Sequence, residues 1–192
     1  MSNLSELLSF NKEFVETKEY EKYSTSKYPD KRMVIVTCMD TRLTEMLPKA
    51  MNLKNGDAKI IKNAGAIITQ PFGNIMRSIL VSLYELQADE VFVIGHHNCG
   101  MVGLNPELII QHMEERGVSS ETITTLKHSG LNLMRWLTGL DNVRESVLNS
   151  VSIIRNHPLL PADIQVHGLL IDPDTGELEL VSDGSIPVEA SL

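Results

Sequence analysis

The sequence predicts an α/β fold: a mainly parallel central sheet of about four strands plus one antiparallel edge strand, helices on both faces, and an amino-terminal helical arm. Several β-branched runs are too continuous for half-exposed strands, which is typical of parallel strands covered on both sides. Segments with apolar residues at helical spacing separate these runs, and this alternation indicates βαβ crossovers. A turn motif near the carboxyl end predicts that the last strand returns antiparallel.

The composition is that of one globular domain, which we expect to span residues 1–192. Of the 192 residues, 42% are hydrophobic and 22% are charged, and the net charge is −8. This acidic balance disfavours nucleic acid and anionic membranes, because both are bound through Lys and Arg. No apolar run approaches the ~20 residues of a membrane span, and the first helix lacks a signal peptide's apolar core. We therefore expect a cytoplasmic protein with no nucleic-acid or membrane partner.

Residues 1–31 are expected to form a helical arm followed by an extended segment. Leu4, Leu7 and Leu8 lie at the spacing of an amphipathic helix among charged residues. Residues 16–31 are rich in Lys, Glu, Tyr and Ser and show little apolar periodicity. This stretch is therefore predicted to be extended.

The predicted strands are short apolar runs that end at glycines or turn residues. Four of them are candidates for the parallel part of the sheet: residues 33–38, 59–61, 91–94 and 164–171. Residues 172–176, with the sequence Asp-Pro-Asp-Thr-Gly, form a predicted turn. Residues 178–181 should therefore return antiparallel to the strand before them.

The helices between these strands are predicted from their start signals. Asn74, Asn105 and Asp141 each precede an apolar pattern of helical spacing and are suitable N-cap residues. Pro48 lies inside the pattern of residues 43–51, where its missing N–H predicts a short or broken helix.

The candidate functional residues lie where two predicted strands end. Cys38 ends the first strand, and His96 and Cys99 follow the strand 91–94. A single cysteine at a strand end is usually an apolar filler. Here, however, both cysteines of the chain fall at the sheet edge where such folds bind ligands. Two thiolates and one imidazole suit zinc, so the sequence predicts one Zn²⁺ per chain on Cys38, His96 and Cys99.

The fourth position of this site decides what the site does. Water there makes a catalytic centre, whereas a fourth side chain closes it. Asp40 is suitably placed to accept a hydrogen bond from that water, and Arg42 can hold the carboxylate by bidentate pairing. Without that pairing Asp40 could coordinate the ion itself. Asp40 is thus either a catalytic partner or a conditional fourth ligand.

Three motifs together resemble the β-class carbonic anhydrases. They are Cys38-x-Asp40-x-Arg42, Lys62-Asn63-Ala64-Gly65 and Gly95-His96-x-x-Cys99-Gly100, in that order. The resemblance implies zinc on the two cysteines and the histidine, an Asp40 and Arg42 dyad, and reversible hydration of carbon dioxide to bicarbonate. It also implies a homodimer or a higher oligomer of dimers, in which the amino-terminal helix commonly embraces the partner.

The carbon dioxide reaction further requires backbone donors for the developing bicarbonate oxygens, and we expect Gly65 and Gly100 to allow such close approach. Three other hypotheses stay open from the sequence. The site could hydrolyse a related molecule such as carbonyl sulfide or carbon disulfide. Asp40 could close it, leaving a non-catalytic regulatory module. The two cysteines could instead form a dithiol redox pair, although a Cys-x-x-Cys element is absent from the sequence.

Overall fold

The computed structural model describes residues 2–185 and confirms the predicted α/β class. Five strands form one sheet in the order β2-β1-β3-β4-β5. Neighbours among the first four strands are parallel, and β5 pairs with β4 antiparallel. The strands are β1 (Met33–Cys38), β2 (Ala58–Asn63), β3 (Glu90–His96), β4 (Gln165–Ile171) and β5 (Leu178–Ser182). The turn 172–176 lies between β4 and β5, as predicted.

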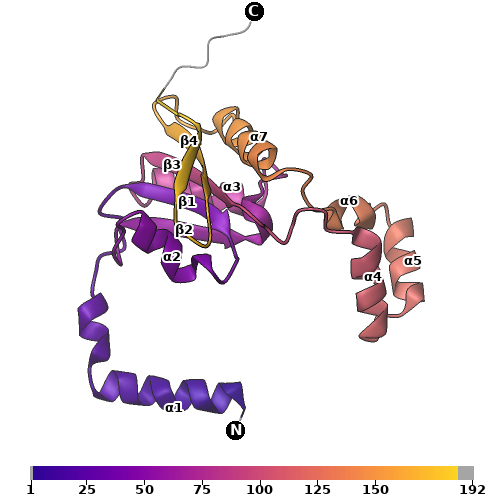
Figure 1. The fold of residues 1–192 in the computed structure, drawn as a ribbon, viewed down its shortest axis with the longest axis horizontal. Coiled ribbons are helices and arrows are strands. Elements are labelled where there is room, and N and C mark those ends of the chain that lie inside the picture. Colours follow the sequence, from indigo (N-terminus) through magenta and orange to yellow (C-terminus); the bar gives the residue numbers. More distant parts are fainter. Residues whose placement is uncertain (1, 186–192) are drawn as a thin grey trace, which may run out of the picture.

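Helices cover both faces of this sheet (Figure 1). One face packs against α3 (Asn74–Tyr84) and α7 (Val143–Arg155) through a valine- and isoleucine-rich core. The other face packs against α2 (Leu43–Ala50). Because side chains alternate along a strand, Val34 and Val36 face the first core and Ile35 faces the second.

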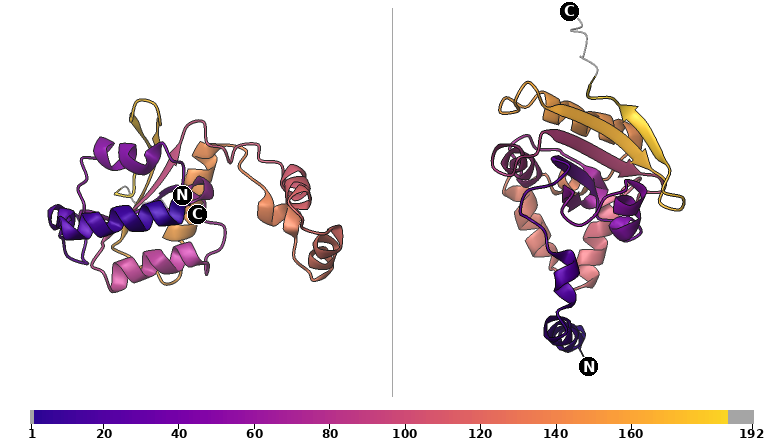
Figure 2. Two further views of the ribbon diagram at one scale, coloured as in Figure 1. Left: turned by 90° about the horizontal axis from the view of Figure 1, so that it is seen from below. Right: turned by 90° about the vertical axis from the view of Figure 1, so that its left-hand side faces the viewer.

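The 3-10 helix η2 (Ala64–Ala66) follows β2 and lies against β1 and β3. The other helices are α1 (Asn3–Glu16), the 3-10 helix η1 (Glu19–Tyr23), α4 (Pro106–Glu115), α5 (Ser120–His128) and α6 (Leu133–Leu137). In Figure 2, the group of α4, α5 and α6 stands apart from the sheet in the left view, and α1 does so in the right view. Within residues 2–185, no helix combines the length and the apolar character needed to cross a membrane.

Two of the four local predictions for helices need correction. The N-cap residues are Gly73 rather than Asn74 for α3, and Asn142 rather than Asp141 for α7. Adjacent residues of similar capping ability cannot be separated by pattern alone. The prediction of a short helix around Pro48 is confirmed, because α2 has eight residues and ends two residues after the proline. Asn105 does cap α4, accepting the N–H of Glu107.

Some of the observed helices were not predicted from the sequence. The segment predicted to be extended contains η1, and α5 and α6 were not predicted at all. Each of α5 and α6 buries a single residue, Ile123 and Leu133 respectively. Such short helices give little apolar periodicity, so the signal that found the other helices is weak here.

Two glycines allow α7 to lie close against the sheet. A Cβ at Gly95 on β3 would lie 2.8 Å from side-chain atoms of Val143 and Val147. A Cβ at Gly168 on β4 would lie 2.9 Å from Val147. The absence of side chains at these positions therefore sets the distance between α7 and the sheet.

A Gly168→Ala variant is therefore expected to lower the free energy of unfolding by about 1–3 kcal/mol, the usual cost of overpacking a core. Urea denaturation would measure the change. Gly100→Ala is the matched control, because a Cβ at Gly100 meets nothing within 4 Å. An equal effect of the two substitutions on stability would contradict this account of the packing.

Candidate metal centre

Three potential metal ligands converge at the carboxyl ends of two neighbouring strands. β1 ends with Cys38 and β3 ends with His96, and Cys99 follows β3 after a turn. Their ligand atoms lie within 4.8 Å of one another, and the two Sγ atoms are 4.0 Å apart. All three residues are buried. In the described part of the chain, this is the one group of three or more His, Cys, Asp or Glu with that geometry.

The ring of His96 is oriented for coordination through Nε2. Its Nδ1 lies 2.8 Å from the carbonyl oxygen of His97. A carbonyl only accepts hydrogen bonds, so Nδ1 carries the ring hydrogen and Nε2 keeps its lone pair. Nε2 is buried and has no hydrogen-bond partner among residues 2–185. A buried nitrogen without a partner is costly, and a metal ion would satisfy it.

The environment of the two thiols differs. Burial raises the pKa of Cys38, but the adjacent imidazole of His96 and the backbone N–H of Gly65 outweigh it and lower the pKa to about 7. Burial raises the pKa of Cys99 above its usual value. Because the thiolate is the form that binds metal, Cys38 is the thiol already closer to its ligand form.

Asp40 is held beside the three ligands by Arg42. Nε of Arg42 donates to Oδ1 of Asp40 at 3.0 Å, and Nη2 donates to Oδ2 at 2.8 Å. These bonds keep the pKa of Asp40 well below its usual range. Oδ2 lies 3.7 Å from Nε2 of His96, so the carboxylate borders the centre while its oxygens are occupied by the guanidinium. The expected dyad is therefore formed in the structure as a bidentate ion pair.

The contact that orients Arg42 was not predicted. Its Nη2 also donates to the carbonyl oxygen of Asn98, at 3.2 Å. Asn98 adopts a positive φ of 53°, a conformation that asparagine tolerates better than most residues. Any residue type supplies a backbone carbonyl, so the sequence contains no signal for this contact.

The two glycines expected near the substrate occupy different surroundings. The N–H of Gly65 donates to Sγ of Cys38 at 3.4 Å, so it supports a ligand. Gly100 is exposed, beside Cys99, with open space around its Cα. Gly65 thus supports Cys38, one of the three candidate ligands, and this contact was not predicted from the sequence.

The arrangement can hold a metal ion. Two sulfurs and one imidazole nitrogen are soft or borderline donors of the kind that zinc prefers. Three such ligands leave the fourth corner of a tetrahedron available. The unpartnered Nε2 of His96 points to the same conclusion.

Comparisons with known proteins identify the family of this chain. A family model described as carbonic anhydrase matches residues 33–178. The chain is 58% identical over 184 residues to a Bacillus subtilis strain 168 protein named "Putative carbonic anhydrase YvdA", covering 96% of this chain and 93% of the relative. It is also 26% identical over 157 residues to a carbon disulfide hydrolase of Acidithiobacillus thiooxidans, covering 78% of this chain and 76% of that protein.

A solved structure gives the same result for the fold. The crystal structure of β-carbonic anhydrase isoform I from Trichomonas vaginalis superposes with a TM-score of 0.85 and 36% sequence identity. The match covers 96% of this chain and 100% of the other. The motifs, the sheet order and these similarities together show that this chain belongs to the β-carbonic anhydrase family.

Proposed function

We propose that this protein binds one Zn²⁺ through Cys38, His96 and Cys99 and catalyses the reversible hydration of carbon dioxide to bicarbonate. One observation carries the proposal: three buried soft donors converge while the adjacent carboxylate of Asp40 is held by Arg42. That arrangement supports an available fourth position at the ion. Zinc, when bound, acidifies a water molecule and supplies a nucleophile near neutral pH.

The residues around the ion have separate roles in this proposal. Nδ1 of His96 donates to the carbonyl of His97, which fixes the ring with Nε2 toward the centre. Arg42 keeps Asp40 ionised and prevents its oxygens from reaching the ion. The ionised carboxylate is an acceptor only, so Oδ2 can accept a hydrogen bond from water and orient it. Carbon dioxide itself is uncharged and requires no ion pair for binding.

Stopped-flow measurement of carbon dioxide hydration on the zinc-loaded protein tests this function. We expect a rate above the buffer background at pH values between about 7 and 9, together with one zinc per chain by elemental analysis. Zinc-loaded protein without hydration activity across that range would contradict the catalytic proposal. Protein purified without metal, and unable to take up zinc, would contradict the metal site as well.

A second candidate substrate is carbon disulfide. The similarity to a carbon disulfide hydrolase favours it, although the identity of 26% is less than half of that to the Bacillus subtilis relative. Both molecules are small, linear and uncharged, so the same centre could attack either carbon. Incubation with carbon disulfide and assay of released sulfide distinguishes them: sulfide release without carbon dioxide hydration would favour this candidate.

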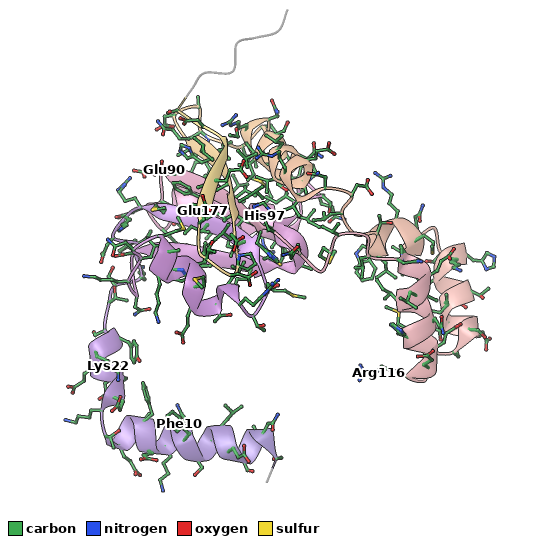
Figure 3. All side chains as sticks on the ribbon, viewed as in Figure 1. Phe10, Lys22, Glu90, His97, Arg116 and Glu177 are labelled. Carbon is green, nitrogen blue, oxygen red and sulfur yellow. The ribbon has the colours of Figure 1, made fainter. Side chains whose placement is uncertain are left out.

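We also propose that the protein is a homodimer or an oligomer of dimers. α1 buries none of its residues, and Leu4, Leu7 and Leu8 are each more than 60% exposed. Figure 3 shows Phe10, on α1, far from His97, which follows β3. A second copy of this chain would cover this apolar helix, which agrees with the arm expected from the family resemblance.

A Leu8→Asp variant is therefore expected to weaken the dimer about 10–100-fold, because burying a leucine contributes ~1.5–3 kcal/mol. Size-exclusion chromatography with light scattering over a range of protein concentrations measures the shift. Glu13→Gln on the same exposed helix is the control and should leave the mass unchanged. A monomeric wild-type chain at all concentrations would refute the proposed assembly.

A further inference from the structure

The loop after β2 carries backbone strain next to the metal centre. Gly65 and Ala66 both have positive φ, 78° and 56°. Glycine adopts this conformation freely, but the Cβ of an alanine disfavours it. Ala66 is also buried, with 1% of its surface exposed. A strained residue of this kind persists only where surrounding contacts hold it in place.

Ser150 on α7 supplies two such contacts. Its Oγ accepts the N–H of Ile68 at 3.1 Å and lies 3.5 Å from the carbonyl oxygen of Ala66, to which it donates. The serine is 1% exposed, on the face of α7 that also buries Val147 and Val151. A hydroxyl on such a face is costly to bury unless it is hydrogen-bonded. Its partners are the backbone groups on either side of Ile67.

The same loop supports a metal ligand. The N–H of Gly65 donates to Sγ of Cys38 at 3.4 Å, and this bond is one of the interactions that lower the pKa of that thiol. Hydrogen bonds of this kind orient ligands and adjust their basicity. Ser150 is therefore connected to Cys38 through the backbone of Ala66 and Gly65.

We propose that Ser150 is a positioning residue for the metal centre. Its hydroxyl holds the loop in the left-handed conformation and thereby keeps the N–H of Gly65 on the sulfur of Cys38. It does not reach the reacting atoms itself. This inference rests on the proposed function, because it assigns Cys38 as a zinc ligand.

The first test compares the zinc affinity of Ser150→Ala with that of wild type by competition with a chelator. We expect about a tenfold loss, the lower end of what supporting contacts contribute to metal affinity. The cobalt-substituted variant should also show a shifted thiolate-to-cobalt absorption band, because the hydrogen bond to Cys38 is weakened. Ser82→Ala is the matched control: Ser82 is buried, on α3, and donates to the carbonyl of Ser78 at 2.8 Å.

The second test uses the strain itself. In an Ala66→Gly variant the loop adopts the left-handed conformation without the hydrogen bonds of Ser150, because glycine has no Cβ. The double variant Ala66→Gly, Ser150→Ala should therefore bind zinc less than about threefold more weakly than Ala66→Gly alone. This comparison remains informative if Ser150→Ala alone fails to fold. A tenfold or greater loss in the glycine background would show that the hydroxyl does not act through loop strain, and would overturn the proposal.

The outcomes distinguish failure of the Ser150 role from failure of the zinc site. Wild-type protein that binds zinc, with Ser150→Ala indistinguishable from Ser82→Ala in affinity and cobalt spectrum, overturns the role of Ser150 alone. Wild-type protein that binds no zinc overturns the proposed function and this inference together.

Discussion

A Cys38→Ser variant is expected to lose zinc and, with it, carbon dioxide hydration. Serine is nearly the same size, but its hydroxyl is not deprotonated near neutral pH and is a harder donor than a thiolate. Loss of one of three protein ligands should weaken zinc binding by more than ~100-fold, since even supporting residues contribute 10–100-fold. Chelator competition measures the affinity, and stopped-flow assay should give only the background rate.

The same variant should also lose the stabilisation that zinc provides. Cys38 and His96 lie on different strands, so a shared ion links β1 to β3 in the folded state only. Wild-type protein in zinc at 100 times the dissociation constant should gain about 2.7 kcal/mol of unfolding free energy, whereas Cys38→Ser should gain little. His97→Ala is the control for metal content, because His97 is exposed and outside the ligand group. Full zinc occupancy in Cys38→Ser would refute the ligand assignment.

An Arg42→Ala variant is expected to retain zinc but hydrate carbon dioxide roughly 100-fold more slowly. Arg42 makes two side-chain hydrogen bonds to the carboxylate of Asp40, one to each oxygen. Without them the carboxylate can turn toward the ion and become its fourth ligand, which excludes water. Zinc content and stopped-flow rates, measured on the same preparation, separate loss of turnover from loss of metal.

Two controls make the Arg42 experiment specific. Arg42→Lys keeps the positive charge but not the bidentate geometry, so its rate should lie between those of wild type and Arg42→Ala. Arg116→Ala removes an arginine that lies just beyond α4, far from the metal centre (Figure 3), and should hydrate at the wild-type rate. An Arg42→Ala rate equal to that of wild type would show that Arg42 does not keep Asp40 from the ion.

The contacts that support the site illustrate the limit of sequence analysis. The bond from Arg42 to Asn98, the bond from Gly65 to Cys38 and the bonds of Ser150 all involve a backbone N–H or carbonyl. Every residue type except proline offers both groups, so the sequence contains no signal for which of them is used. Only the packing of α7 and of the turns against the strand ends selects these partners.

The sequence by itself determined the parallel strands, through its continuous β-branched runs, and the types of the three candidate ligand residues that follow those runs. It also determined that these ligands lie at one edge of the sheet, because parallel strands bring their carboxyl ends together. The tertiary structure alone decided the distances. It placed two sulfurs 4.0 Å apart and, among residues 2–185, left Nε2 of His96 without a hydrogen-bond partner. It also joined Arg42 to the carbonyl of Asn98 and built α5 and α6, because these features arise from contacts between segments far apart in sequence or from helices too short to show periodicity.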